Sequence, residues 1–343
     1  MRPPPLRMGL LGCADIAWRN ALPAMERVPD VALVACASRD RAKAERFAAR
    51  FGGDALAGYE ELLARPDVDA VYVPLPSGLH HPWGRRALEA GKHVLLEKPA
   101  VTSAAEAADL AALAGGRGLW VGENFTFVHH AQHRAVRRLI DEGAIGEPRG
   151  LRAVFGIPPR PPGDIRYDAE LGGGALLDLG SYVVRAAQLL LGDELSVLGS
   201  MLRMAGDLGV DVGGNALLCS ADGVPAELMF SFETGYRSAQ SIWGAHGRLT
   251  LERAFTTPPT LRTVARVERQ DHVEEITLPA DDQFAAALRA FAGSVRALGA
   301  SGDGEHRLRR SLDALLRRAA LLDEIRERAH VVDVDGPVPA GVR

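Results

Sequence analysis

The sequence predicts an α/β fold with two domains. The first is a Rossmann domain with a doubly wound parallel sheet over residues 1–124, and the second is an α+β domain with a large, mostly antiparallel open sheet over residues 125–343. Two observations lead to this prediction. Up to Asn124, short apolar runs alternate with stretches of helical period, which is the pattern of βαβ units. Beyond about Phe125 strand-like segments follow one another, and Asp222-Gly223 and His246-Gly247 supply turns typical of an antiparallel sheet.

Each element of the first domain is predicted from its own pattern. The apolar runs predict buried strands at Met8–Leu11, Val31–Ala37, Ala70–Val73, His93–Leu96 and Leu119–Gly122. The periodic stretches between them predict helices at Ile16–Arg27, Arg41–Phe51, His80–Ala90 and Ser103–Leu113. A capping box marks the start of the last helix, with Ser103 as the N-cap residue and Glu106 three positions later.

The second domain is predicted to begin with helical and loop segments before its sheet. We expect a helix at His130–Glu142, a strand at Gly150–Ile157, a proline- and glycine-rich loop at Pro158–Gly174 and a helix at Leu176–Leu191. Strands are expected at Leu195–Met204, Ala216–Ser220, Ala226–Phe232, Tyr236–Trp243 and Val264–Leu278. Two helices, Asp282–Leu298 and Arg307–Arg328, end the fold, and packing of these helices back onto the first domain is left open.

The composition excludes several classes of protein. A formal net charge of −4 over 343 residues argues against nucleic-acid binding through phosphate neutralisation. No segment approaches the roughly 18 consecutive apolar residues of a membrane span, and no apolar signal-peptide region follows the start. Cys13, Cys36 and Cys219 lack metal-binding spacing and cannot all pair, so we expect reduced thiols and a cytoplasmic location.

The first strand leads into a glycine-containing turn that resembles the dinucleotide fingerprint G-x-G-x-x-G/A. Its three positions are Gly12, Ala14 and Ala17. Gly12 permits the tight turn, and Ala17 permits close contact between helix and strand. Ala14 departs from the pattern, so we expect the pyrophosphate to lie slightly further out and to be held by amides at the helix N-terminus.

The end of the second strand bears on the choice of cofactor. NAD sites usually place a carboxylate there, whereas this chain has Ser38 and Arg39. A hydroxyl and a guanidinium suit the 2′-phosphate of NADP, which a carboxylate would repel. Asp40 comes too late and is expected to cap the next helix. The sequence therefore favours NADP over NAD, with a solvated charge cluster as the alternative.

Glu97-Lys98-Pro99 closes the apolar run His93–Leu96, at the end of a predicted parallel strand. Ligands of such sheets bind just beyond the carboxyl ends of the strands, so Lys98 is a candidate acid or base for a substrate oxygen. The alternative is a solvated lysine at a strand end. Pro99 fixes the turn, and X-Pro is the linkage in which a cis peptide costs least.

With these motifs the chain resembles the glucose–fructose oxidoreductase, inositol dehydrogenase and MocA group of NAD(P)-dependent oxidoreductases over nearly its whole length. The similarity lies in Gly12–Ala17, Val73–Pro76, Leu79-His80, Gly91–Pro99 and Gly172–Gly180. It is closest to bacterial nucleotide-sugar 3-ketoreductases that make deoxysugars for glycosylated antibiotics. That narrower resemblance lies in Gly12–Arg19, Ile157–Pro159, Gly163–Tyr167 and Tyr182, and in that subgroup Ala14 is expected.

The resemblance implies site residues as well as a fold. It makes Lys98 the proton donor to the substrate carbonyl and places Tyr182 near the same oxygen, although a tyrosine packed in the core is the alternative. It also implies cofactor contacts from Gly12, Cys13, Ala14, Asp15, Ile16, Ser38, Arg39, Leu75, Pro76, His80, Glu97, Lys98, Asn124, Arg166 and Asp178. For His80 and Asp178, helix capping is an alternative, and Arg166 is expected to reach either the cofactor or a substrate phosphate.

Residues for substrate binding are expected from several segments. The resemblance and the cleft position imply Arg19, Lys98, Tyr182 and Tyr236. Arg237 is expected to converge with Arg166 on a diphosphate, and Trp243 is expected to join Tyr236 in stacking on a pyrimidine. The alternative is that these arginines are solvated and the aromatic side chains belong to the core.

The sequence therefore predicts an NADPH-dependent reductase of the 3-keto group of a nucleotide-linked deoxyhexose. The alternatives are an enzyme acting on a free sugar, inositol or dihydrodiol, and a non-catalytic NADP-binding regulator. Leu228, Phe230 and Phe232 alternate along one strand, and we expect them to form an exposed interface of a homodimer or homotetramer. His129 and His133 lack a carboxylate partner in a motif, so no metal site is predicted.

Overall fold

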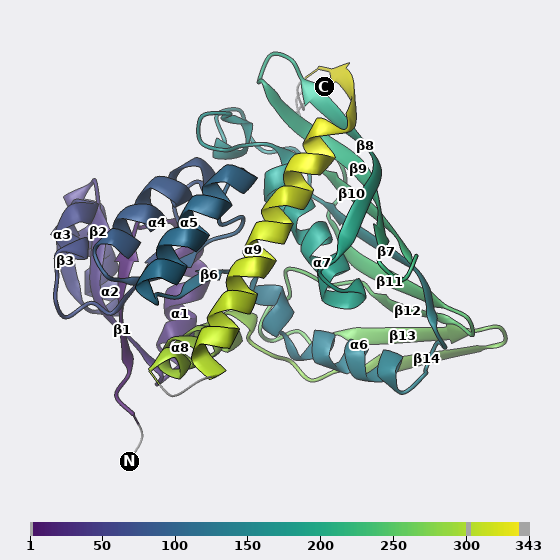
Figure 1. The fold of residues 1–343 in the computed structure, drawn as a ribbon, viewed down its shortest axis with the longest axis horizontal. Coiled ribbons are helices and arrows are strands. Elements are labelled where there is room, and N and C mark those ends of the chain that lie inside the picture. The colour runs from purple at the N-terminus through teal and green to yellow at the C-terminus, as the bar shows by residue number, and fades with distance from the viewer. Residues whose placement is uncertain (1–2, 300–302, 336–343) are drawn as a thin grey trace. The chain divides into compact units, whose positions relative to one another are not determined.

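The structure, a computed structural model, describes residues 3–299 and 303–335 and consists of two compact units. The first unit comprises Met1–Thr126 and Phe284–Leu316, and the second comprises Phe127–Gln283 and Arg317–Arg343. The division passes through one long helix, α9 (Asp303–Glu327), whose first part belongs to unit 1 and whose last part belongs to unit 2. Each unit contains a sheet of its own (Figure 1).

The sheet of unit 1 has six strands in the order β3-β2-β1-β4-β5-β6, and all of its pairings are parallel. This is the strand order of a dinucleotide-binding Rossmann fold, in which the order reverses between β1 and β4. The strands are β1 (Leu6–Leu11), β2 (Val31–Ser38), β3 (Asp54–Ala57), β4 (Ala70–Val73), β5 (His93–Leu96) and β6 (Val121–Glu123). The central strands are almost continuously apolar because helices cover both faces of the sheet.

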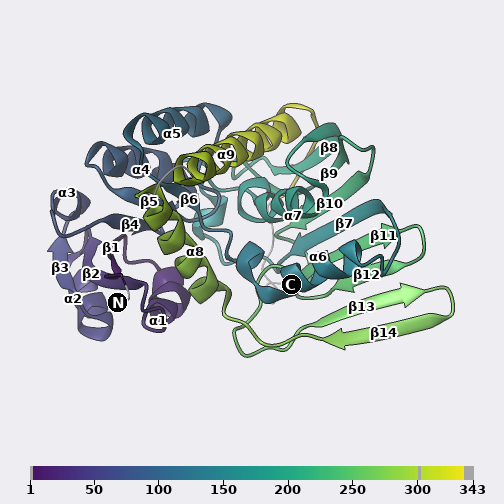
Figure 2. The same ribbon diagram turned by 60° about the horizontal axis from the view of Figure 1, so that its bottom comes forward.

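The helices of unit 1 lie on both faces of this sheet, with α4 and α5 along one face and α1 and α2 along the other (Figure 2). Late in the chain, α8 joins this unit, where Phe291 packs close to Gly122 and Arg296 pairs with Asp30 at 2.7 Å. The bounds are α1 (Leu22–Met25), α2 (Arg41–Phe51), α3 (Tyr59–Leu63), α4 (His80–Glu89), α5 (Ala104–Arg117) and α8 (Gln283–Leu298).

The sheet of unit 2 has nine strands in the order β14-β13-β12-β11-β7-β10-β9-β8-β15. Its pairings are antiparallel except for β10 with β7 and β15 with β8. The strands are β7 (Pro148–Gly156), β8 (Leu195–Ala205), β9 (Val210–Ser220), β10 (Pro225–Ser231), β11 (Arg237–Gly244), β12 (Arg248–Leu251), β13 (Val264–Arg269), β14 (His272–Thr277) and β15 (Ala329–Val334). Together the two sheets confirm the predicted fold class.

One face of the nine-stranded sheet is covered by helices, and we call it the inner face. Helix α7 (Ser181–Leu191) packs there after a π-helical turn, η5 (Leu176–Gly180), and α6 (Ala131–Asp141) belongs to the same unit. The inner face contributes Phe155 and Phe230 to the core. The opposite face, which we call the outer face, bears none of the helices that the described residues of this unit form (Figure 1).

The expected exposed interface at Leu228, Phe230 and Phe232 is wrong. All three side chains are buried, and Phe230 lies against the π-helical turn close to Gly180. Side chains along a strand alternate between the faces of a sheet, so the apolar set of β10 points to the inner face and its alternate set points outward. The outer face of β10 therefore carries Glu227 and Met229 instead.

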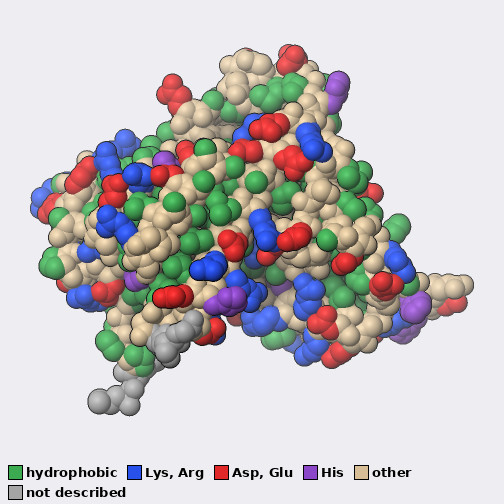
Figure 3. Space-filling model, viewed as in Figure 1, with side chains coloured by type: hydrophobic (Ala, Val, Ile, Leu, Met, Phe, Trp, Pro, Cys, Tyr) green, Lys and Arg blue, Asp and Glu red, His purple; other side chains and the backbone are tan. Residues whose placement is uncertain are grey.

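The surface carries charges of both signs. On the face drawn in Figure 3, acidic and basic side chains are interspersed, as the many Arg–carboxylate pairs of the structure would lead one to expect. Within residues 3–299 and 303–335, none of the helices has the length and apolar character needed to cross a lipid bilayer.

Candidate active site

The turn after β1 has the geometry that the dinucleotide fingerprint requires. Gly12 adopts a φ of +110°, and a Cβ added to it would lie 2.5 Å from Leu75 Cδ2. Only glycine is suited to that position, because its backbone is in a region that other residues rarely adopt and its side is closed by Leu75. The chain then enters a π-helical turn, η1 (Ala17–Ala21), in which Ala17 is fully buried.

A cavity of about 450 Å³ opens beside this turn, at the carboxyl ends of β1, β2 and β4. It brings together most of the predicted residues of the fingerprint and of the second strand. Its lining is Gly12, Cys13, Ala14, Ser38, Arg39, Asp40, Lys43, Tyr59, Pro74, Leu75 and Pro76. Asp40 caps α2, as expected, because its Oδ1 accepts from the amides of Ala42 at 3.0 Å and Lys43 at 3.4 Å.

Lys43 is a basic residue of this cavity that the sequence reasoning missed. It lies in the first turn of α2, where its charge is close enough to Cys13 to oppose the effect of burial, which raises the pKa of that thiol to about 11. The available signal was a basic residue in the first turn of a helix, where acidic residues are usually preferred. Arg39 lies near Tyr59, where burial raises the pKa of the Tyr59 hydroxyl and the charge of Arg39 opposes that shift. The Tyr59 ring meets Trp83 edge-on at 4.7 Å.

These residues fit a dinucleotide that carries a 2′-phosphate. The turn at Gly12 lines the cavity, and a pyrophosphate can lie there beside the backbone of the turn. At the other end of the cavity Ser38, Arg39 and Lys43 offer a hydroxyl and two cations, while the nearest carboxylate, Asp40, is engaged in capping α2. The predicted hydroxyl and guanidinium are thus both present in the cavity, and Lys43 adds a second cation.

Lys98 follows β5 in a segment that several hydrogen bonds fix. Glu97 Oε1 accepts from the Tyr72 hydroxyl at 2.7 Å and from Asn124 Nδ2 at 2.6 Å. The Lys98–Pro99 peptide is cis, and Glu123 Oε1 accepts from the next amide, that of Ala100, at 2.9 Å. The predicted residues Glu97, Lys98 and Asn124 therefore come together at the carboxyl ends of β5 and β6.

His80 contacts the backbone of this segment at Pro99. It is buried, and its two ring nitrogens each lie 2.7 Å from a carbonyl oxygen, Nδ1 from that of Pro99 and Nε2 from that of Leu75. Burial lowers the pKa of His80, while the two carbonyl oxygens oppose that effect. His80 thus ties the loop of Leu75 to the loop of Lys98, so any influence on a cofactor would pass through these two loops.

In unit 2, the predicted residues Arg166 and Asp178 form an ion pair. Arg166 Nε donates to Asp178 Oδ2 at 2.7 Å, and its Nη1 donates to Asp164 Oδ1 at 3.0 Å. Burial alone would lower the pKa of Arg166, but Asp178 and Asp164 outweigh burial and raise it. The proline- and glycine-rich loop is therefore fastened to the π-helical turn through a permanently charged guanidinium.

Tyr182 lies in the first turn of α7, within an aromatic cluster on the inner face. Its ring centroid is 5.0 Å from that of Phe155, in an edge-on arrangement, 5.8 Å from that of Phe127 and 5.9 Å from that of Phe255. Tyr182 is only partly buried. The cluster fixes the plane of the ring, which leaves the hydroxyl as the polar end of an otherwise apolar wall.

Of the remaining substrate residues, Tyr236 lies on the same side of the sheet as Tyr182. Its ring contacts Phe155 edge-on at 6.5 Å, Arg253 stacks on it at 4.8 Å, and its hydroxyl bonds to Thr256 Oγ1. In unit 1, Arg19 and Asp15 form an exposed ion pair on the first helical turns.

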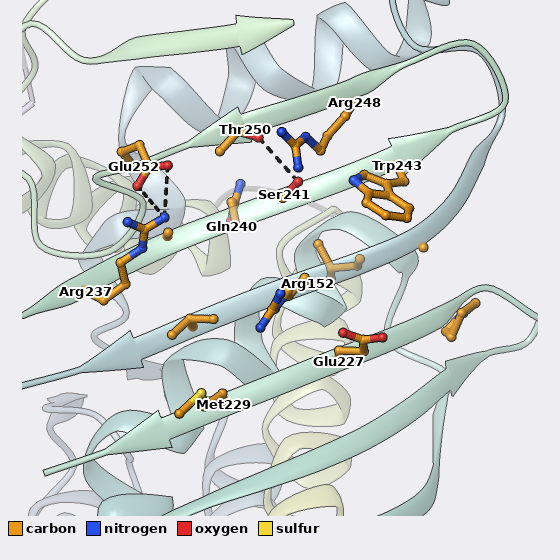
Figure 4. A pocket seen from close by; sticks show the side chains of 15 residues that line it. Arg152, Glu227, Met229, Arg237, Gln240, Ser241, Trp243, Arg248, Thr250 and Glu252 are labelled. Atoms are coloured by element: carbon orange, nitrogen blue, oxygen red, sulfur yellow. Dashed lines mark hydrogen bonds and ion pairs between the residues drawn. The ribbon is translucent and has the colours of Figure 1, made fainter. Parts of the chain in front are cut away.

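Arg237 and Trp243 lie on the outer face. The expectations that Arg237 converges with Arg166 on a diphosphate and that Trp243 joins Tyr236 on a pyrimidine are therefore wrong. The two residues line an outer-face cavity of about 540 Å³, in which Arg237 pairs with Glu252 at 2.8 Å (Figure 4). The alternation along β11 explains the error, because Tyr236 is an odd number of positions from both residues and so faces the other way.

The histidines near residue 130 do not form a metal centre. Among the described residues, three or more His, Cys, Asp or Glu side chains nowhere gather as metal ligands. His133 Nε2 instead lies 2.8 Å from the carbonyl oxygen of Ala254, and burial lowers its pKa to about 4.

Comparison with known proteins adds an independent finding. Residues 6–125 match the model of an oxidoreductase family with an NAD-binding Rossmann fold, and residues 133–250 match the GFO/IDH/MocA C-terminal domain. Two curated relatives are named dTDP-3,4-didehydro-2,6-dideoxy-alpha-D-glucose 3-reductase. The relative from Actinomadura kijaniata is 52% identical over 95% of this chain and 96% of its own, and that from Saccharopolyspora spinosa is 50% identical over 94% and 96%.

Solved structures give the same picture. KijD10, a 3-ketoreductase from Actinomadura kijaniata in complex with NADP and TDP-benzene, superposes with a TM-score of 0.91 at 51% identity and covers 96% of this chain and 99% of its own. An aldose–aldose oxidoreductase from Caulobacter crescentus superposes with a TM-score of 0.83 at 24% identity, which shows a common fold only.

Proposed function

The chain belongs to the GFO/IDH/MocA family of oxidoreductases, and we propose that it uses NADPH to reduce the 3-keto group of a dTDP-linked keto-deoxyhexose. The observation that carries this proposal is the identity of about half of all residues, over nearly the full length of both chains, with dTDP-sugar 3-reductases. We propose a cytoplasmic location, which the free state of Cys13, Cys36 and Cys219 supports.

The cofactor would be held by the residues of the first unit. The turn at Gly12 takes the pyrophosphate, and Ser38, Arg39 and Lys43 take the 2′-phosphate of the adenosine. The cofactor supplies the hydride that reduces the carbonyl carbon. Protein side chains bind and orient the substrate, and one of them donates the proton.

Lys98 is the proposed general acid. When the carbonyl carbon gains hydride, its oxygen becomes an alkoxide, and the Lys98 ammonium donates one proton to that oxygen to give the hydroxyl group. Hydrogen bonds restrain the backbone on both sides of Lys98. Before it, Glu97 accepts from Tyr72 and Asn124. After it, the Ala100 amide donates to Glu123. These restraints support a role that depends on fixed geometry.

Tyr182 is the proposed second residue acting on that carbonyl oxygen, through a hydrogen bond from its hydroxyl. Three aromatic neighbours hold the ring, so the hydroxyl can be aimed without loss of side-chain entropy on binding. Tyr236 is proposed to offer a ring face to the pyrimidine, and Arg19 and Arg166 to contribute positive charge to phosphate binding.

The test is a comparison of substrates. NADPH oxidation is followed with a freshly prepared dTDP-linked 3-keto-deoxyhexose, with the corresponding free sugar and with 1,5-anhydro-D-fructose. Reduction of NADP+ is followed with D-xylose and with a dihydrodiol, since a dehydrogenase oxidises these compounds. We expect kcat/KM to be highest for the nucleotide-linked sugar, because binding energy from the diphosphate can be used to position the reacting carbon. Agreement of the free and nucleotide-linked sugars within about tenfold would mean that the nucleotide is not recognised.

The same assays test the alternative functions, which also have support. A 33% identical relative is named D-xylose 1-dehydrogenase, and a 29% identical relative is named trans-1,2-dihydrobenzene-1,2-diol dehydrogenase, so a free sugar or a dihydrodiol is the second candidate class of substrate. Tight binding of NADPH without turnover of any of these compounds would favour a non-catalytic regulator.

We also propose that a second copy of the chain covers the outer face to form a homodimer or homotetramer. That face presents Val154, Met229 and Trp243, of which Trp243 is 61% exposed. Replacement of Trp243 by glutamate should lower the oligomer size measured by light scattering, whereas an unchanged mass would argue against this face.

A further inference from the structure

Asp211 is the second residue of β9, and it caps the helical segment that carries Asp178 and Tyr182. Its Oδ2 accepts a hydrogen bond of 2.6 Å from the Leu176 amide, and the neighbouring Ala175 amide helps to stabilise the charge of this carboxylate. Amides at the start of a helix have no partner within the helix, so an acceptor from elsewhere must supply one. Here the acceptor comes from a strand 35 positions later in the chain.

The same carboxylate packs against the glycine turn before this helix. Gly174 has a φ of +110°, and a Cβ on it would collide with Asp211 Oδ1. Gly173 is confined as well, since a Cβ there would lie 2.5 Å from the carbonyl oxygen of Arg166 and 2.7 Å from that of Asp168. The Gly174 amide donates to the Arg166 carbonyl oxygen at 2.9 Å, so the turn connects Asp211 to the loop that carries Arg166.

The charge of Asp211 is retained in an environment that disfavours it. Burial raises its pKa to about 6, and the amides of Leu176, Asp211 itself and Ala175 oppose that shift together with Arg326 on α9. Buried carboxylates with a shifted pKa are common at functional sites, where they are present despite a cost in stability.

We propose that Asp211 is a positioning residue of the reductase, which fixes where the π-helical turn begins and thereby the placement of Asp178 and Tyr182. This inference rests on the proposed function. Two connections carry it: the short bond to the Leu176 amide and the close packing of the carboxylate on Gly174. Asp211 acts through the backbone of the helix start, because its hydrogen bond goes to the Leu176 amide and its carboxylate packs on Gly174.

Asp211→Asn tests the proposal, because it keeps the size of the side chain and replaces one acceptor oxygen by a donor. Ser220→Ala is the matched control. Ser220 lies at the other end of the same strand, and its Oγ likewise accepts from a backbone amide, that of Val224, at 3.0 Å. We expect Asp211→Asn to lower kcat by about tenfold or more with KM for NADPH unchanged, and Ser220→Ala to leave both unchanged.

A second measurement does not depend on turnover. Amide hydrogen exchange over residues 174–182 should become at least about tenfold faster in Asp211→Asn and stay at the wild-type rate in Ser220→Ala. If Asp211→Asn does not fold, Asp211→Ser, which keeps a shorter acceptor, should give the same two results.

Unchanged exchange in this segment overturns the proposal, and so does faster exchange with an unchanged kcat. A fall in kcat accompanied by an equal loss of NADPH affinity also overturns it, since that would indicate a general loss of structure. If the wild-type protein reduces no keto sugar, the proposed function fails, and exchange alone then decides whether Asp211 holds the helix start.

Discussion

Removal of the two cations near the end of β2 should change the cofactor preference of the enzyme in a graded way. Arg39 and Lys43 line the cavity with Ser38, and both are exposed enough for solvent to weaken their bonds to a phosphate. A hydrogen bond to a charged group contributes about 1.5–3 kcal/mol, and solvent exposure places each of these at the lower end of that range. Each cation therefore accounts for about tenfold in affinity for a 2′-phosphate.

We expect the wild-type enzyme to prefer NADPH over NADH by about tenfold or more in kcat/KM, which corresponds to about 1.4 kcal/mol. Arg39→Ala and Lys43→Ala should each raise KM for NADPH about tenfold, and the double variant about a hundredfold. The same variants should leave kcat/KM for NADH unchanged, because NADH has no 2′-phosphate. Steady-state kinetics with both cofactors at fixed, saturating substrate measures all four values.

Arg41→Ala is the matched control for this prediction. Arg41 lies on the same helix turn and carries the same charge, but it is not part of the cavity lining and pairs with Glu45 at 2.9 Å on the surface. Its removal should leave KM for NADPH within about twofold of the wild-type value. Equal use of the two cofactors by the wild type, or an equal effect of Arg41→Ala and Lys43→Ala, would refute the assignment of the 2′-phosphate site.

Three further predictions concern the reacting groups and the turn regions. Lys98→Ala should lower kcat about a hundredfold while NADPH still binds, and Tyr182→Phe should lower it less; near-normal turnover of Lys98→Ala beside an inactive Tyr182→Phe would reverse the two roles. Gly12→Ala should weaken NADPH binding by about tenfold or more in a fluorescence titration, because its Cβ would meet Leu75 and its φ is +110°. The pKa of Asp211 is raised from 3.8 to about 6, so the folded protein binds the proton more tightly than the unfolded chain. The free energy of unfolding of the wild type should therefore fall by about 2 kcal/mol relative to Asp211→Asn as pH rises from about 4 to about 6, measured by urea unfolding at several pH values.

Much of the first unit was predictable because its strands are buried on both faces. The predicted bounds of β4, β5 and α2 agree with the structure, and those of β1 and β2 differ by one or two residues. The missed strand β3 is an edge strand with only Leu56 buried, and its Asp54-Ala55-Leu56-Ala57 sequence has no β-branched or aromatic residue. The missed helix α3 has only five residues, too few to show a helical period.

In the second unit, the sequence indicated strands but not their partners. The turns at Asp222-Gly223 and His246-Gly247 do connect neighbouring strands, whereas the predicted strand Val264–Leu278 is a hairpin that turns at residues 270–271. The parallel pairings of β7 with β10 and of β8 with β15 join segments far apart in the chain, and no local pattern reveals them. Without those pairings, the buried face of β10 could not be assigned, which is why Phe230 was placed on an exposed face. The error at Trp243 is local, because Tyr236 and Trp243 are an odd number of positions apart along one strand.

The predicted site residues that the structure brings together are those whose signal is a position in a local motif. Ser38 and Arg39 follow from the end of a strand, and Lys98 follows from the end of another. The sequence did not predict Lys43 as a cavity residue, because residues in the first turn of a helix more often indicate capping than ligand binding. Asp211 had no signal at all, since its partner is the start of a helix that precedes it by 35 positions.

The two π-helical turns found among the described residues show why tertiary anchors matter for this site. η1 follows the Gly12 turn and contains Arg19, and η5 follows the Gly174 turn and contains Asp178. A π-helical turn is rare and less favourable than an α-helical one, so each needs support from outside its own segment. For η5 that support is visible in the bond from Asp211 and the ion pair between Asp178 and Arg166. The geometry at Tyr182 is therefore set by contacts between distant segments, and replacement of an anchor should disturb it even where Tyr182 and its aromatic neighbours are unchanged.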